Sequence, residues 1–178
     1  MKISKIEVGP LLENCYVLEK NNEIIIIDPG DEYTKIQEKV NKKQVVAVLI
    51  THYHFDHVGA LDSIIENHCH NVMDFNCKAG VYKIGSFEFE LINTPGHKED
   101  AVSFYFKNNE VMFVGDFIFK GTIGRYDLSG GNYKEMIESL LKIKKYDPNT
   151  LIYPGHGSST TLFDEFKTNP YFLSLEEA

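Results

Sequence analysis

Cysteine is scarce in this sequence, and the cysteines present form no recognisable pair. Cys15, Cys69 and Cys77 are the three cysteines among 178 residues, and none lies in a CxxC pattern. An odd number of widely spaced cysteines argues against a disulfide framework and fits a reducing compartment. Cys69 lies between His68 and His70, but adjacent residues on a short loop rarely converge on one ion, so we expect no metal site there.

Long hydrophobic runs are missing as well. The longest, such as Ile24–Ile27 and Val45–Ile50, are far shorter than the ~20 apolar residues of a membrane-spanning helix. Residues 1–20 show no basic head followed by an apolar stretch, so no secretory signal is visible. We therefore expect a cytoplasmic protein without a membrane partner.

Positive charge is in deficit. The chain has 18 Lys and Arg against 26 Asp and Glu, a net charge of −8. Nucleic acid binding uses a basic face, and the densest basic cluster, Lys142, Lys144 and Lys145, is short enough to be a solvated helix face. We expect no nucleic acid partner, and the sequence indicates no particular oligomeric state.

The pattern of elements predicts an α/β protein. No repeat and no linker-like stretch divides the chain, so residues 1–178 are expected to form a single domain, within the usual range of about 100–200 residues. Apolar and β-branched segments predict strands at 16–18, 24–27, 45–50, 81–92 (a hairpin), 101–106, 110–114 and 151–153. Helical spacing predicts helices at 34–42, 58–66, 133–146 and 161–166, the last stopping before Pro170.

Histidines form the most informative cluster. His52, His54, Asp56 and His57 follow directly on the apolar segment 45–50. In an extended backbone alternate side chains share a face, so the first three can point the same way. His57 is expected to begin the next helix, where the chain turns and can aim the ring back. Imidazoles beside a carboxylate form the nitrogen and oxygen set that zinc, iron or manganese accepts.

Three further fragments end an apolar segment with a metal-ligand residue beside glycine. They are Gly96-His97, Gly115-Asp116 and Gly155-His156. Glycine allows a sharp turn and leaves room near an ion. Taken singly, each histidine is an ordinary loop residue; together with the first cluster, these residues supply what a two-metal site still lacks.

The order of these residues resembles the metallo-β-lactamase superfamily. The resemblance runs from about Asn14 to His156 and rests on His52-x-His54-x-Asp56-His57, His97, Asp116 and His156. It implies an αββα sandwich, in which two mixed sheets pack face to face between helices, with the metals at one edge. The implied ligands are His52, His54 and His97 for one metal, Asp56, His57 and His156 for the other, and Asp116 as a bridge.

The resemblance also implies the cofactor and a supporting residue. Two divalent metal ions are expected, zinc first, with iron or manganese as alternatives. Asp28, in Asp28-Pro29-Gly30 after an early strand, is similar to the family residue that supports the site from behind.

Residues at several positions indicate which branch of the superfamily the chain resembles. Asp116 stands where the antibiotic-hydrolysing zinc enzymes usually carry Cys, and His54 where the flavodiiron branch carries Glu, so both activities are disfavoured. The stretch 115–125 is similar to the glyoxalase II group, the hydroxyacylglutathione hydrolases. There a basic residue at the position of Arg125 anchors a substrate carboxylate. The chain resembles small members that lack the C-terminal helical domain, and it carries Lys98-Glu99-Asp100 where the family has Thr-x-Gly.

These features predict a binuclear metal-dependent hydrolase, a thioesterase acting on small S-2-hydroxyacyl-glutathione-like substrates. A metal-bridging hydroxide would attack the thioester carbonyl. Asp56 and Asp116 are the predicted catalytic residues, with Asp56 orienting the nucleophile. Arg125 is predicted to clamp a distal carboxylate; an ion pair with Asp127 is the other interpretation of this arginine.

Other activities remain open. Gly124-Arg125-Tyr126-Asp127 is also similar to persulfide dioxygenases, which would use one iron held by two histidines and Asp116. Lactonases and phosphodiesterases share the histidine motif. A non-catalytic, metal-stabilised binding module is the remaining class, but a structural site closes with four ligands and needs no shared bridge.

Overall fold

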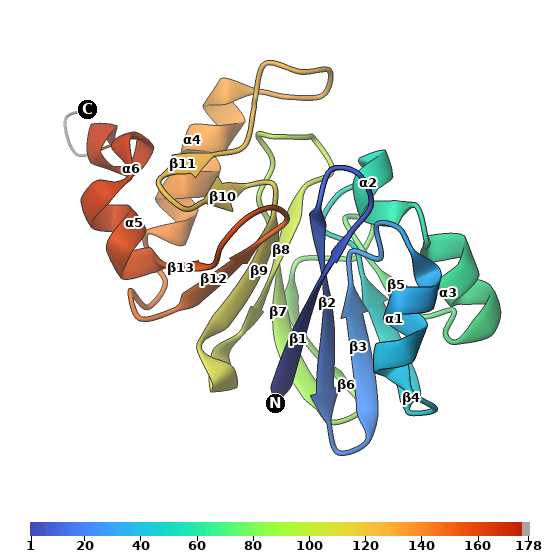
Figure 1. Ribbon diagram of the computed structural model, residues 1–178. Coiled ribbons are helices and arrows are strands. Elements are labelled where there is room, and N and C mark those ends of the chain that lie inside the picture. Colours follow the sequence, from blue (N-terminus) through green and yellow to red (C-terminus); the bar gives the residue numbers. More distant parts are fainter. Residues whose placement is uncertain (176–178) are drawn as a thin grey trace.

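Two β-sheets stacked face to face, with helices on their outer faces, make up the structure (Figure 1). The computed structural model describes residues 1–175. Both sheets mix parallel and antiparallel pairs. The predicted αββα sandwich with two mixed sheets is confirmed.

The first sheet contains the amino-terminal half of the chain, in the order β1-β2-β3-β4-β5. Its strands are β1 (Lys2–Val8), β2 (Glu13–Lys20), β3 (Glu23–Ile27), β4 (Gln44–Leu49) and β5 (Val72–Met73). Three helices belong to this half: α1 (Tyr33–Val40), α2 (Phe55–Val58) and α3 (Leu61–Asn67). The edge strand β1 was not predicted from the sequence.

The second sheet has the order β13-β12-β9-β8-β7-β6. Its strands are β6 (Gly80–Ile84), β7 (Phe87–Asn93), β8 (Val102–Phe106), β9 (Val111–Gly115), β12 (Leu151–Pro154) and β13 (Thr160–Thr161). The other elements of this half are the 3-10 helix η1 (Lys107–Asn109), the small hairpin β10 (Ile118–Phe119) and β11 (Thr122–Ile123), and the helices α4 (Tyr133–Ile143), α5 (Leu162–Thr168) and α6 (Pro170–Ser174).

The run of isoleucines in β3 shows why the central strands have apolar side chains on both faces. Ile25 and Ile27 point into the core between the sheets, whereas Ile24 and Ile26 point into the layer under α1 and α3. A strand covered on both faces has no polar side. The second sheet is covered in the same way by α4 and α6 on its outer face.

One predicted helix is divided in the structure, and the helix α6 was not predicted. The helix expected at 58–66 is divided into α2 and α3, and His57 lies inside α2 rather than at a helix start. A Cβ on Gly59 would lie 2.3 Å from the carbonyl oxygen of Gly30, so this close approach of the two backbones requires glycine at the break. Pro170 begins α6, because proline is well suited to the first turn of a helix.

Membrane insertion finds no support in these elements. Within residues 1–175, no helix combines the length and the apolar character needed to cross a bilayer.

Candidate metal centre

Loops at one edge of the sandwich gather the predicted ligands from both sheets. Each ligand follows the end of a strand or lies in the short helix α2. The sources are the loop after β4 for His52 and His54, α2 for Asp56 and His57, the β7–β8 loop for His97, the end of β9 for Asp116, and the loop after β12 for His156. The sequence interpretation had Asp56 on extended backbone, but it lies in the first turn of α2.

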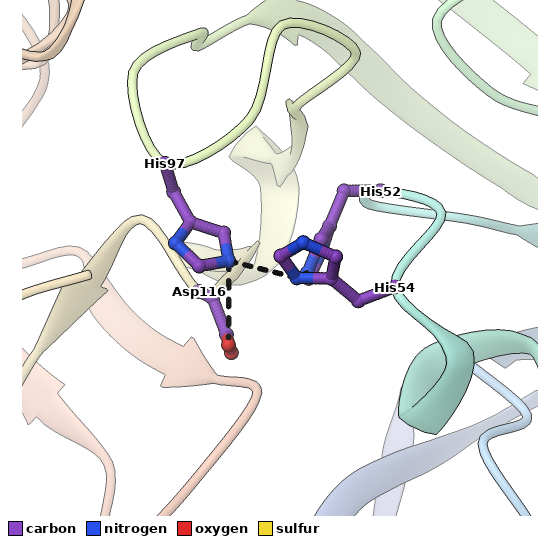
Figure 2. A group of neighbouring side chains, drawn as sticks. All are labelled: His52, His54, His97 and Asp116. Atoms are coloured by element: carbon purple, nitrogen blue, oxygen red, sulfur yellow. Dashed lines mark hydrogen bonds and ion pairs between the residues drawn. The ribbon is translucent and has the colours of Figure 1, made fainter. Parts of the chain in front are cut away.

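The first cluster consists of His52, His54, His97 and Asp116 (Figure 2). The Nδ1 atom of His54 lies 3.0 Å from Nε2 of His52 and 3.0 Å from Nε2 of His97. In Figure 2, His97 faces the two other rings from a separate loop, and the carboxylate of Asp116 lies below the His97 ring. One ligand atom from each residue lies within 4.8 Å of all the others, so the four can hold one ion.

The second cluster consists of Asp56, His57 and His156. Oδ2 of Asp56 lies 3.2 Å from Nε2 of His156 and 3.9 Å from Nε2 of His57. His57 is fully buried, while about a quarter of the His156 side chain (28%) is exposed. The cluster is thus open to solvent on the His156 side.

Asp116 lies between the two clusters. Its Oδ1 is 3.4 Å from Nε2 of His57 and 3.7 Å from Nε2 of His156. Its other oxygen, Oδ2, is 3.7 Å from Nε2 of His97 in the first cluster. A carboxylate with one oxygen facing each cluster has the position that a bridging ligand needs.

Hydrogen bonds fix the orientation of two rings. Nδ1 of His97 donates to the carbonyl oxygen of Arg125 at 2.6 Å, and Nδ1 of His156 donates to that of Leu11 at 3.2 Å. Each ring therefore turns Nε2 inward. Histidines that bind metals usually donate their other N–H to a carbonyl or carboxylate in this way.

Asp28 orients a third ring from behind. Its Oδ2 accepts a hydrogen bond from Nδ1 of His57 at 3.0 Å and another from the Thr51 hydroxyl at 2.6 Å. Its Oδ1 accepts from the backbone N–H of Thr51 at 2.7 Å. The side chain is thus anchored to the start of the histidine loop and leaves Nε2 of His57 facing the clusters.

The first cluster favours neutral imidazoles. Burial lowers the pKa of His52 well below its usual value, and the neighbouring His57 and His97 lower it further. Burial, followed by the charge of His97, also lowers the pKa of His54. Because a metal ion competes with protons for the same nitrogen, these shifts favour metal binding near neutral pH.

Carboxylates around the second cluster dominate the electrostatics of His57. Burial opposes the charged form of His57, but Asp116 and Asp28 outweigh burial and hold its pKa well above the usual value. Burial likewise opposes the charged form of Asp116, yet His57 outweighs it and lowers the pKa of this carboxyl. The negative field at this position is the kind that a divalent cation neutralises.

Two polar atoms support the assignment of metals to this place. Nε2 of His57 and Oδ1 of Asp116 are buried and, within the described residues, have no hydrogen-bond partner. Leaving such atoms unsatisfied is costly, and a cation between them would satisfy both. Nitrogen and oxygen donors of this kind accept zinc, iron or manganese. The two clusters are therefore consistent with a binuclear metal site.

Glu13 was missed by the sequence analysis. It begins β2 and is completely buried, with Oε1 3.7 Å from Nδ1 of His57 and no hydrogen bond to either oxygen. Burial raises its pKa to about 10, although His57 opposes the rise. No local pattern distinguishes this glutamate from an exposed strand residue, so the sequence carried no signal for it.

Arg125 pairs with an acidic neighbour. Its Nε and a terminal nitrogen each lie 2.9 Å from one oxygen of Asp127, and both side chains are mostly exposed. The structure thus shows the ion pair that was the second interpretation of this residue. Arg125 also lines the pocket in front of the candidate ligands.

The pocket in front of the ligands has a volume of about 400 Å³. Apart from the ligands, it is lined by Leu11, Phe55, Phe119, Arg125 and Leu128. Four of these five side chains are apolar, so the pocket combines polar groups at its floor with apolar walls, as substrate pockets do.

Comparison with known families agrees with this geometry. The model of the metallo-beta-lactamase superfamily matches residues 8–70 and 76–156, which include all seven ligand-type residues. The chain belongs to this superfamily. The expected membership is therefore confirmed.

Relatives within the superfamily match over nearly their whole length. The Bacillus subtilis protein named probable metallo-hydrolase YqgX is 33% identical, covering 96% of this chain and 97% of its own. The Haemophilus influenzae hydroxyacylglutathione hydrolase GloC is 30% identical, covering 98% of this chain and 99% of its own. Among solved structures, the BLEG-1 B3 metallo-beta-lactamase superposes with a TM-score of 0.89 at 28% identity, covering 96% of this chain and 99% of its own.

Proposed function

We propose that the protein is a binuclear metal-dependent hydrolase that cleaves small-molecule thioesters. The observation that carries this proposal is the position of Asp116, with one oxygen facing each histidine cluster. A purely structural site needs four ligands and no shared carboxylate. The resemblance to a relative named hydroxyacylglutathione hydrolase supports the thioester as the bond that is cleaved.

The side chains of the site have distinct tasks in this reaction. Two bound divalent ions would lower the pKa of a water molecule and polarise a carbonyl group. Asp56, 14% exposed and beside His156, accepts a hydrogen bond from the attacking water and orients it. Asp28 keeps His57 in its inward orientation. A thiolate is a good leaving group, so the chain needs no dedicated general acid.

Recognition of the thiol moiety is assigned to the wall of the pocket. Arg125 contacts a carboxylate of the substrate, for which its planar guanidinium is suited. Asp127 holds this guanidinium in the free protein. Binding an acidic thiol therefore requires the substrate to compete with Asp127.

Metal analysis together with a hydrolysis assay tests the proposal. We expect about two metal ions per chain, zinc first, and turnover of S-lactoylglutathione. His54→Ala is expected to lose metal and to lower kcat/KM by more than about a hundredfold, because losing a ligand costs more than losing a supporting residue. His70→Ala, an exposed histidine outside both clusters, serves as the control and keeps both properties.

Two outcomes would contradict the proposed thioesterase function. Full activity in His54→Ala would exclude the binuclear mechanism. A single iron per chain, no thioester turnover, and oxygen uptake with a persulfide would show the dioxygenase instead.

β-Lactam hydrolysis is a second candidate, favoured by the similarity to BLEG-1. Aspartate at position 116 argued against this activity from the sequence. Turnover of a chromogenic cephalosporin faster than that of S-lactoylglutathione by the same metal-loaded sample would replace the thioesterase with the lactamase.

A further inference from the structure

A second hollow lies beside the metal pocket, and the proposed reaction does not use it. This side hollow has a volume of about 270 Å³ and lies between the β1–β2 turn, the Gly30-Asp31 loop and α2. It shares Leu11, Phe55 and Asp56 with the metal pocket. In Figure 1, the β1–β2 turn and α2 lie next to each other at the same end of the sandwich. The two spaces thus meet along the Leu11–Phe55 pair.

Two large apolar side chains are exposed where the hollows meet. Leu11 is 52% exposed and Phe55 is 73% exposed. Phe55 stands between His54 and Asp56, one ligand from each cluster. Adjacent exposed apolar groups beside a set of polar groups are typical of a ligand site, because a bound ligand removes them from water.

The walls of the side hollow are held in place. The backbone N–H of Leu12 donates to Gly9 at 3.2 Å, and the N–H of Gly9 donates to the Glu32 carboxylate at 3.1 Å. The carbonyl of Leu11 accepts from the ring of His156 at 3.2 Å. Leu11 therefore stands on a turn that is anchored to the metal centre itself.

The negative charge around the side hollow favours an uncharged ligand group over an anionic one. The charged side chains in its lining are Asp31 and the ligand Asp56, and the lining contains no lysine or arginine. A group bearing a carboxylate would meet repulsion there, whereas an uncharged apolar group would gain contact with Leu11, Phe55 and Val8. The cation of the site, Arg125, lines the metal pocket and not this hollow.

We propose that the side hollow binds an uncharged aliphatic group of the substrate, attached to the bond that is cleaved at the metal centre. This inference rests on the proposed hydrolase function and specifies its substrate class, namely thioesters with an aliphatic acyl chain. The chain passes between Leu11 and Phe55, and its charged or polar thiol part lies on the Arg125 side.

A series of thioesters with increasing chain length tests this assignment. With metal-loaded protein and S-acyl-N-acetylcysteamines from acetyl to decanoyl, kcat/KM is expected to rise about two- to fourfold per methylene until the hollow is filled. Leu11→Ala should flatten this rise. Leu12→Ala is the matched control, because Leu12 is 60% exposed and lines neither space. A flat profile in the wild type, or an unchanged rise in Leu11→Ala, would overturn the proposal.

A charge introduced into the side hollow distinguishes it from the metal pocket. Asp31 lines the side hollow alone. Asp31→Lys is expected to raise the preference for an adipoyl thioester over the hexanoyl thioester by at least about threefold, since the new ammonium would meet the distal carboxylate. An unchanged preference would place the acyl chain elsewhere and contradict the proposal.

Binding measurements separate this inference from the hydrolase itself. If no ester or thioester is turned over, the proposed function fails. Calorimetry with decanoate and butyrate then tests whether the side hollow binds an aliphatic chain. Tighter binding of decanoate by the wild type, lost in Leu11→Ala, supports it, and equal affinities overturn it.

Discussion

Asp116 contacts histidines of both clusters, so its removal should affect both metals at once. We expect Asp116→Ala to bind fewer than two ions per chain and to lower kcat by at least about a thousandfold, because the mutation removes the carboxylate that faces both clusters. Elemental analysis and kinetics measure this. Asp62→Ala, an exposed aspartate of α3, is the control. Two full sites in Asp116→Ala would contradict the bridging role.

Glu13 predicts an unusual pH dependence of stability. Its pKa is about 10 in the folded protein, against about 4.5 for an ordinary glutamate. Above pH 4.5 the unfolded chain releases the proton while the folded chain keeps it, so this group lowers the free energy of unfolding as pH rises. Glu13→Gln removes that dependence and should stabilise the metal-free protein by about 1–3 kcal/mol at pH 8 and much less at pH 5.

Urea unfolding at the two pH values checks the Glu13 prediction. Glu138→Gln, whose glutamate is 64% exposed, provides the control and should show no difference that grows with pH. If Glu13→Gln changes the free energy of unfolding by the same amount at both pH values, the Glu13 carboxyl is ionised in the folded protein, and the prediction is wrong.

The pair of Arg125 and Asp127 predicts opposite effects of two substitutions. Arg125→Ala should raise KM for a glutathione thioester about two- to fivefold with little change in kcat, as loss of a ground-state contact does at an exposed site. Asp127→Asn removes the charge and one of the two acceptors that hold the guanidinium and should lower KM. Steady-state kinetics with S-lactoylglutathione measure both. Equal KM values in all three proteins would remove Arg125 from substrate binding.

At the scale of elements, the strands with the clearest patterns were predicted, whereas the edge strand β1 and the two-residue strands β5, β10, β11 and β13 were not. The segment 45–50 has no polar side because both of its faces are covered, and it forms β4. The strand β1 alternates poorly, because several of its side chains face solvent at the edge of the sheet. The break between α2 and α3 depends on the approach of Gly59 to Gly30, a tertiary contact that helical spacing cannot indicate.

The start of α4 offers a test at this scale. The side chain of Asn132 accepts hydrogen bonds from the backbone N–H groups of Lys134 and Glu135. Asn132→Ala leaves these donors without the cap and should lower the free energy of unfolding by about 1 kcal/mol, while Asn132→Asp should retain most of it. Denaturant unfolding measures the difference. Equal losses in the two variants would show that the cap contributes nothing.

For the whole molecule, the metal centre joins the two sheets. His52 follows a strand of the first sheet, whereas His97 and Asp116 follow strands of the second. Bound ions should therefore stabilise the complete fold, and the gain at a hundredfold excess over Kd is about 2.7 kcal/mol. Thermal unfolding during zinc titration should show a rising Tm in the wild type and a smaller rise in Asp116→Ala. A constant Tm in the wild type would mean that metal binding and folding are independent.

The candidate ligands could be picked out from the sequence because histidine and aspartate beside glycine are unusual at strand ends. The structure brings all seven together. The residues around them were harder to predict. A supporting role for Asp28 came from the resemblance alone, and its contact with His57 is seen only in the structure. The burial of Glu13 depends on packing that involves distant parts of the chain. A short motif of metal-binding residue types can be recognised in the sequence, whereas the burial of a single side chain such as Glu13 cannot.

The contact between the start of β2 and the segment around His156 also has a consequence for biosynthesis. Asn14 donates to the carbonyl of Pro154, 140 residues away, and Glu13 forms an isolated bridge with His156. During translation His52, His54, His97 and Asp116 leave the ribosome well before His156 does. A nascent chain can thus bring the first cluster together before the second, which lacks a member until His156 has been synthesised. Completion of the second cluster therefore requires that the segment after β12 has been made and has paired with the start of β2.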